Sequence, residues 1–181
     1  MKMLLLVGVV IVAVIIVLVA VMLVIGSRLN PNHVASRAIR LKEAPTEVYA
    51  VIHDFERSPN WRSDLKKVEM LGVVDGHPRF REQGSHGGVT YEVLEDVAGQ
   101  RLVTRIVDRD LGYSGSWTQV LTPNDKGTLL TITENGEVSN PLFRFMSRYV
   151  FGQTSTIDNY LKSLAKHFGE SSQPEPAATV H

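Results

Sequence analysis

The fold of this chain is decided by the stretch NPLFRFMSRYVFGQTSTIDNYLKSLAKHF, residues 140–168 of 181. Asn140 suits a helix N-cap, and Pro141 suits the first helical position because proline needs no N–H partner there. Apolar side chains, joined by one Gln, then recur at steps of three and four residues. This stripe consists of Leu142, Phe145, Met146, Tyr149, Val150, Gln153, Ile157, Tyr160, Leu161, Leu164 and Phe168. The spacing predicts one amphipathic helix of about eight turns, ending before Gly169.

A helix with so long an apolar side needs a wide partner surface, and the preceding residues predict a sheet. Turn signals such as Asp75-Gly76 and Asn124 to Gly127 separate alternating runs of strand length. The predicted strands cover residues 33–41, 65–74, 78–83, 89–96, 101–108, 113–122 and 128–138. A short helix opens at Pro45 and is broken at Pro59, just before Trp61. Because most connections are short, the sequence predicts an α+β domain with a seven-stranded antiparallel sheet over the C-terminal helix.

Two segments resemble a known family. The segment EAPTEVYAVIHDFERSPNW, residues 43–61, and the run GTLLTITE, residues 127–134, are similar to the START-like (SRPBCC) superfamily of polyketide cyclases/dehydrases and lipid transport proteins. The resemblance extends from residue 34 to 169. It implies a helix-grip fold, in which the sheet wraps the long helix and leaves an elongated cavity between them. Members bind lipids, polyketides, quinones or hormones, and a minority catalyse reactions.

The N-terminal residues predict a membrane anchor. Residues 3–25 contain no charged side chain, and as a helix they would be about 35 Å long, enough to span a bilayer. A cleaved signal peptide is the alternative, but it requires a shorter apolar region and a better cleavage site than residues 24–28 provide. The predicted organisation is a short N-terminus (1–2), a transmembrane helix (3–25), a linker (26–32), a START-like domain (33–169) and a disordered tail (170–181).

The distribution of charge bears on which side of the membrane the domain occupies, and it leaves both sides open. Arg28, Arg37, Arg40 and Lys42 follow the span, and this excess of basic residues favours a cytoplasmic domain at the cell membrane. A short leader with the single Lys2 is also typical of an anchor that places the domain outside. The absence of cysteine is compatible with either compartment.

Composition and motifs argue against several functions. The formal net charge is zero with no basic run, which predicts no nucleic-acid partner. The six histidines are far apart and there is no cysteine, so no metal site is predicted. Residues 112–116 lack the second glycine of a hydrolase elbow, and residues 84–88 lack the lysine of a P-loop. No cofactor and no catalytic triad are predicted.

Strand parity indicates which side chains face the cavity. Residues 113–121 place Tyr113, Trp117 and Gln119 on one face, and this aromatic face is expected to be the inner one. The predicted cavity residues are Tyr91, Val93, Arg105, Tyr113, Trp117, Ile132, Glu134, Phe145, Met146, Tyr149 and Gln153. The alternative is plain core packing. Arg105 either faces inward and pairs with Glu92 or Glu134, or is solvated outside.

Two functions remain. The first is a membrane-anchored binding or carrier module for an apolar small molecule, such as a lipid, a quinone or a polyketide-like compound. The second is a cyclase/dehydratase-type enzyme acting on a polyketide-like substrate. The lack of a convergent catalytic set in the sequence favours the first.

Overall fold

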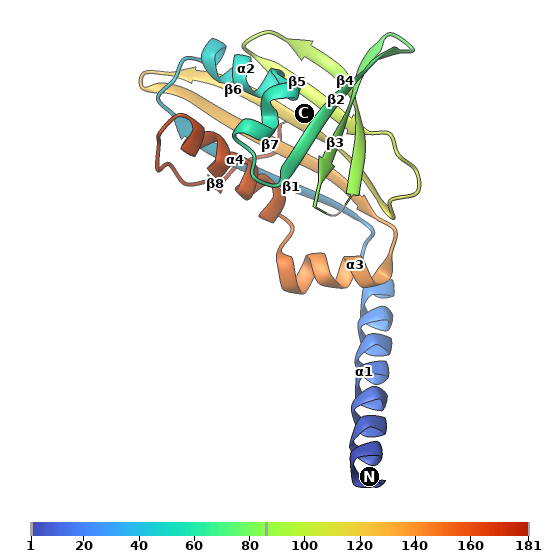
Figure 1. Ribbon diagram of the computed structural model, residues 1–181. Coiled ribbons are helices and arrows are strands. Elements are labelled where there is room, and N and C mark those ends of the chain that lie inside the picture. The colour runs from blue at the N-terminus through green and yellow to red at the C-terminus, as the bar shows by residue number, and fades with distance from the viewer. Residues whose placement is uncertain (1, 86, 181) are drawn as a thin grey trace.

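One strongly curved antiparallel sheet carries the other elements of the domain (Figure 1). The computed structural model describes residues 2–85 and 87–180. The strands are β1 (Asn32–Leu41), β2 (Leu65–Val74), β3 (His77–Gly84), β4 (Gly87–Val97), β5 (Arg101–Ile106), β6 (Tyr113–Asn124), β7 (Gly127–Val138) and β8 (Glu175–Pro176). Their order in the sheet is β2-β3-β4-β5-β6-β7-β1-β8. The predicted strands and the helix-grip fold are confirmed, with β8 added at one edge.

Alternation along the strands builds the core. In β7, Leu130 and Ile132 face inward and are fully buried, while Thr131 and Thr133 lie on the other face. Three helical elements cover the inner face: α2 (Pro45–His53), the 3₁₀ helix η1 (Phe55–Asn60) and α4 (Ser155–His167). Ile157, Leu161 and Leu164 of α4 are fully buried against the sheet. These contacts fix α4 as one wall of the space above the strands.

The single long helix predicted for residues 140–168 is wrong. The chain forms α3 (Pro141–Met146), then the π-helical turn η2 (Ser147–Phe151), and α4 begins only at Ser155. Gly152 separates them with φ +82° and ψ 143°, a conformation that is essentially restricted to glycine. Because the chain changes direction there, only α4 packs on the sheet. Helix α3 packs against the N-terminal helix instead.

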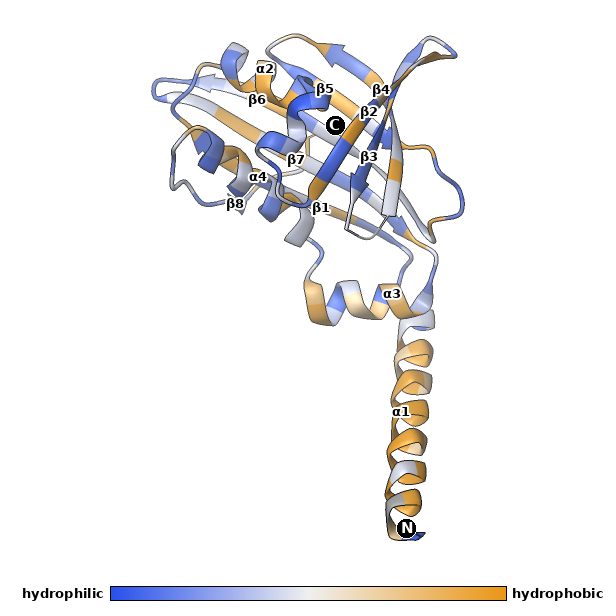
Figure 2. Cartoon of the chain, in the orientation of Figure 1, coloured by the Kyte–Doolittle hydropathy of each residue, from blue (hydrophilic) through white to orange (hydrophobic). Residues whose placement is uncertain are grey.

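The N-terminal helix α1 (Lys2–Arg28) projects away from the domain (Figure 1). Its residues Leu5–Arg28 are long and apolar enough to cross a membrane, and none of the apolar 18-residue stretch that defines this span is buried inside the molecule. Figure 2 shows hydrophobic colouring along nearly the whole helix. The helix extends beyond the predicted 3–25, so the linker shortens to residues 29–31.

The composition of the C-terminal tail predicts disorder. In the structure, the tail instead runs along the edge of the sheet. Strand β8 pairs with β1, and beyond it the Ser36 hydroxyl donates to the Ala178 carbonyl (3.0 Å). The Val180 N–H donates to the Thr133 hydroxyl (2.9 Å). An uncovered edge strand offers free backbone donors and acceptors, and the tail satisfies some of those of β1. The composition of the tail does not predict this pairing, because the pairing depends on the free edge of β1.

Candidate functional site

A cavity of about 330 Å³ lies between the inner face of the sheet and the elements α2, η1 and α4. Its size is at the lower end of the range for small-molecule sites. Strands β3 to β7 supply its floor, and Ile52, Phe55 and Tyr160 of the helical elements cover it. The lining combines aromatic side chains with a few polar groups, as expected of a binding site.

Three aromatic rings form a stacked wall. The rings of Phe55 and Phe80 are 4.0 Å apart with an interplanar angle of 12°. The ring of Tyr91 continues the stack, 5.3 Å from Phe80 at 16°. Parity places Phe80 and Tyr91 side by side, because they are direct cross-strand partners on β3 and β4. Flat parallel rings favour a flat apolar ligand that continues the stack.

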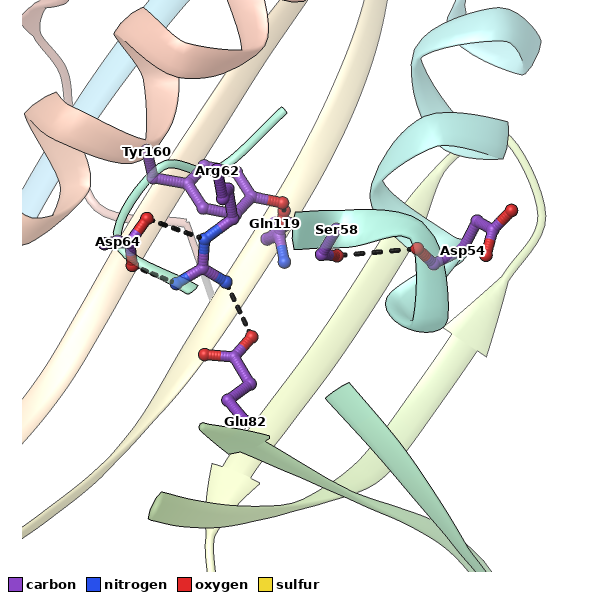
Figure 3. A network of polar contacts seen from close by, with 7 residues as sticks. All are labelled: Asp54, Ser58, Arg62, Asp64, Glu82, Gln119 and Tyr160. Carbon is purple, nitrogen blue, oxygen red and sulfur yellow. Dashed lines mark hydrogen bonds and ion pairs between the residues drawn. The ribbon is translucent and has the colours of Figure 1, made fainter. Parts of the chain in front are cut away.

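A buried ion pair closes the polar side of the cavity (Figure 3). The Arg62 guanidinium donates from Nη1 to Glu82 Oε1 (2.6 Å) and from Nη2 to Asp64 Oδ2 (2.8 Å). Its central carbon lies 5.3 Å from the centre of the Tyr160 ring. The Arg62 and Glu82 side chains are only 14% and 13% exposed. The charge of Glu82 is therefore matched inside the fold rather than by water.

Burial controls the protonation of these groups. Burial raises the pKa of the Glu82 carboxyl, and the Arg62 charge opposes the rise without cancelling it. Burial lowers the pKa of the Arg62 guanidinium, but the carboxylates of Glu82 and Asp64 raise it above its ordinary value, so Arg62 stays charged. Burial is also the main reason that the pKa values of Tyr91 and Tyr160 lie well above the ordinary tyrosine value. Both hydroxyls remain protonated at neutral pH.

A second polar chain lies across the cavity. Trp117 Nε1 donates to Glu134 Oε2 (2.9 Å), and the other Glu134 oxygen lies 3.3 Å from His33 Nε2. Gly136 makes room for this histidine, because a Cβ there would overlap the His33 ring. The Tyr160 hydroxyl donates to Gln119 Oε1 (3.3 Å). The Gln119 amide NH₂ and the Tyr91 hydroxyl make no hydrogen bond to other described residues, so both can serve a ligand.

The structure brings only part of the predicted cavity set together. Tyr91, Tyr113, Trp117 and Glu134 line the cavity. Val93 and Ile132 share the inner face but are covered in the core. Arg105 lies outside, 53% exposed, with its Nη2 3.2 Å from Glu92 Oε2. Arg105 therefore follows the second of the two predicted alternatives, in which its side chain faces solvent. Its ion pair with Glu92 lies on the outer face of the sheet.

The predicted helix residues lie elsewhere. The α3–η2 segment carries Phe145, Met146 and Tyr149 away from the sheet, and none of them lines the cavity. Their expected inward position was wrong because it assumed one unbroken helix, whereas the chain turns at Gly152. Gln153 lines two smaller hollows outside the main cavity.

Several cavity groups are missing from the prediction. Glu82 shares the parity of Phe80 on β3, so alternation alone indicates its inward position. Phe55 lies within the short helix predicted between Pro45 and Pro59, and in the structure it begins η1. Arg62 follows Trp61 in an irregular segment, where no periodicity indicates direction. Its position depends on contacts with β3 and α4 that are distant in sequence.

Comparison with known proteins assigns the domain to a family. A family model described as polyketide cyclase / dehydrase and lipid transport matches residues 33–169. The chain belongs to that family. The comparison with curated protein sequences gives no match.

Solved structures share the fold of this polyketide cyclase / dehydrase and lipid transport family member at low sequence identity. A conserved protein from Geobacillus kaustophilus aligns with a TM-score of 0.64 and 19% identity, covering 79% of this chain and 99% of that one. A START superfamily protein from Mycobacterium smegmatis aligns with a TM-score of 0.60 and 18% identity, covering 75% and 96%. Norcoclaurine synthase from Thalictrum flavum aligns with a TM-score of 0.59 and 11% identity, covering 77% and 87%.

Proposed function

We propose that this protein is a membrane-anchored binding module for a small, flat, mostly apolar molecule that carries oxygen substituents. The observation that supports the proposal most is the cavity itself. One wall is the Phe55–Phe80–Tyr91 stack, and the other side holds polar groups that are charged or hydrogen-bonded. A quinone or polyketide-like ring system matches both sides, because its faces can stack while its oxygens accept hydrogen bonds.

Two free donors favour oxygenated rings over plain acyl chains. The Tyr91 hydroxyl and the Gln119 amide NH₂ are available from neighbouring parts of the cavity. An acyl chain would displace water from these donors without replacing its hydrogen bonds, and each unpaired buried group costs about 1–3 kcal/mol. A ligand carbonyl or hydroxyl removes that cost.

The membrane part of the proposal depends on α1. The Leu5–Arg28 span has the length and composition of a single-pass helix, and an N-terminal span also suits a signal sequence. A retained anchor is favoured because the end of α1 is built into the fold. A Cβ at Gly26 would overlap the Pro141 carbonyl, and Arg144 Nη1 donates to the Leu29 carbonyl (2.8 Å).

The binding test uses the full chain in a non-ionic detergent. Native mass spectrometry of the purified protein is expected to show a co-purified small molecule. Menadione, a two-ring naphthoquinone, is expected to quench tryptophan fluorescence in a saturable way because Trp117 lines the cavity. Trp117→Phe should remove most of this quenching, whereas Trp61→Phe, outside the cavity lining, should keep it.

Two further measurements test whether the ligand is a flat ring system and whether the protein binds a ligand at all. Tyr91→Phe should weaken menadione binding by roughly two- to tenfold, the usual effect of one hydrogen bond. Saturable binding of the fatty-acid probe cis-parinaric acid, with no binding of menadione, would reject the flat-ring ligand. The absence of any bound molecule and of any saturable quenching would reject the binding function.

One observation favours an enzyme as the second candidate. Glu82 is a cavity carboxyl whose pKa is raised by burial, which suits proton transfer to and from a substrate. Cyclisation and dehydration of poly-β-ketones require such transfers. Incubating the full chain with a linear poly-β-ketone analogue and analysing products by mass spectrometry tests this candidate. Turnover by the parent and its loss in Glu82→Gln would establish it, and unchanged substrate would reject it.

A further inference from the structure

An apolar surface on the α3–η2 segment has no partner within the described molecule. Phe143, Tyr149, Val150 and Phe151 are 50%, 59%, 57% and 65% exposed. Large apolar side chains usually avoid such exposure when they lie close together, and a grouped set marks an interaction site. We call these four residues the apolar surface of α3–η2.

The same segment has a polar side that faces the domain. Arg144 donates from Nη1 to the Leu29 carbonyl (2.8 Å) and from Nη2 to the Ser139 carbonyl (3.1 Å). Ser147 and Arg148, one turn further along, line a hollow of about 200 Å³ beside β1. With the polar side fixed on the domain, helical spacing turns Tyr149 and Val150 away from it. The segment is therefore amphipathic, with its apolar side outward.

The position of α3 on α1 identifies what can cover this side. Pro141 contacts Gly26, so α3 begins at the C-terminal end of the apolar span, and Figure 1 shows it running across that end. The 24-residue span is about 36 Å long as a helix, against a hydrocarbon core of about 30 Å. When α1 crosses a bilayer, residues 26–29 lie at the boundary between acyl chains and headgroups. The α3–η2 segment lies at the same depth.

The cavity has a neighbouring hollow at this level. A second space of about 200 Å³ is lined by Phe151, Gly152 and Gln153. It shares four lining residues with the main cavity: Tyr113, Ser114, Glu134 and Thr156. The second space therefore adjoins the cavity on the side of the α3–η2 segment.

From these contacts we infer that the α3–η2 segment lies in the headgroup–acyl boundary of the bilayer and that the cavity exchanges its ligand directly with the lipid. Apolar and aromatic side chains on one side with Arg144 and Arg148 on the other are typical of interfacial helices. The inference rests on the membrane attachment and the cavity ligand proposed above. It adds the lipid surface as a partner and a route for the ligand that avoids water.

The first test uses the absence of cysteine from the chain. Single cysteines are introduced as Val150→Cys, Ile16→Cys and Asp125→Cys, each is labelled with the fluorophore NBD, and the proteins are reconstituted into phosphatidylcholine vesicles. Lipids carrying a shallow nitroxide on the acyl chain report depth. The label at position 150 is expected to shift to the blue and to be quenched by the shallow nitroxide. The label in the β6–β7 turn, at position 125, is expected to behave as in water.

The label at position 16 distinguishes failure of the membrane attachment from failure of the interfacial position of α3–η2. If positions 16 and 150 both report water, the membrane attachment is rejected together with the inference. If position 16 reports the bilayer and position 150 reports water, the attachment stands and the interfacial segment is rejected. If position 150 reports the deep core, the interfacial depth is rejected.

The second test addresses the exchange route. Phe143→Ser/Val150→Ser is compared with Leu71→Ser/Val73→Ser, a matched pair of exposed apolar residues on the edge strand β2. The probe is a naphthoquinone carrying a dodecyl chain, supplied from vesicles. Uptake by the first variant is expected to be slower by about tenfold or more, comparable to losing the transfer free energy of one apolar side chain. Equal uptake rates for both variants and the parent, with equal affinities in detergent, would reject the route.

Discussion

At the scale of single residues, Arg62 is the centre of the polar side of the cavity. It holds two carboxylates, whereas Glu82 has Arg62 as its ion-pair partner among the described residues. Arg62→Leu should therefore lower the free energy of unfolding by about 3–5 kcal/mol, because it leaves a buried carboxylate without a cation. Glu82→Leu should cost clearly less, since Arg62 keeps Asp64. Urea unfolding of the full chain in detergent, followed by tryptophan fluorescence, measures both. Equal losses would contradict this asymmetry.

The raised pKa of Glu82 gives a pH dependence of known sign. A carboxyl whose pKa is higher in the folded state contributes stability that is complete below the unfolded pKa of about 4.3 and is lost as the pH rises through the folded pKa. Glu82→Gln removes this contribution. The stability of the parent relative to Glu82→Gln should therefore fall between pH 4 and neutral pH, as measured by urea unfolding at a series of pH values. A difference that grows with pH would mean that the pKa is lowered instead.

Trp61 gives a residue-scale prediction about packing. Its ring meets Tyr160 of α4 edge-on at 5.1 Å and lies 6.4 Å from His167, so its aromatic partners lie on α4. Its Nε1 is buried without a hydrogen-bond partner among the described residues. Trp61→Ala should cost about 3–5 kcal/mol. Trp61→Phe should cost much less, because no hydrogen bond is lost. Thermal unfolding compares the two variants, and equal losses would show that more than ring packing is involved.

The candidate site was predictable only where it lies on regular strands. Tyr91, Trp117 and Glu134 follow from period-two alternation, which fixes the face of each side chain once the inner face is chosen. Arg62 sits outside any strand or helix, so its direction is set by the ion pair with Glu82, twenty residues further along the chain. Sequence patterns carry no information on such a contact.

At the scale of elements, the strands were predictable because glycine and aspartate turns mark their ends. The helix break was not predictable, because the spacing of three and four residues continues through residues 142–168, with Gln153 as the one polar member of the stripe. The two halves of the stripe end in different surroundings: Ile157 and Leu161 of α4 are buried against the sheet, while Tyr149 and Val150 of η2 are exposed. Periodicity indicates that a face is apolar, and it does not indicate which surface covers it.

Gly152 gives the element-scale prediction. No heavy atom other than its chain neighbours lies within 4 Å of a Cβ built there, so a side chain would not clash. The penalty of Gly152→Ala is therefore conformational, about 1–3 kcal/mol for a backbone region that only glycine readily adopts. Lys162→Ala, on the exposed side of α4, is the control and should stay within about 0.5 kcal/mol of the parent. Urea unfolding that leaves Gly152→Ala as stable as the control would show that the chain relaxes into a continuous helix.

At the scale of the whole molecule, the proposed attachment to the membrane depends on α1. The full chain should remain in the membrane pellet after carbonate extraction, because exposing the Leu5–Arg28 span to water is unfavourable. Val12→Arg/Ile16→Arg is a matched full-length control. Each arginine near the centre of the span disfavours insertion by about 2.5–3.5 kcal/mol, so this variant should be extracted. Recovery of both proteins in the supernatant would exclude the anchor.

The C-terminal tail beside β1 has a consequence for crowding. Tethered domains share one orientation on a membrane and meet each other sideways at high local concentration. An open β-strand edge in that plane is a template for pairing with the same edge of a neighbour. The pairing of β8 with β1, at Arg37 and Ala38, occupies part of this edge within each molecule. For the proposed anchored protein, the tail thus reduces the part of the β1 edge that can pair with a neighbouring copy.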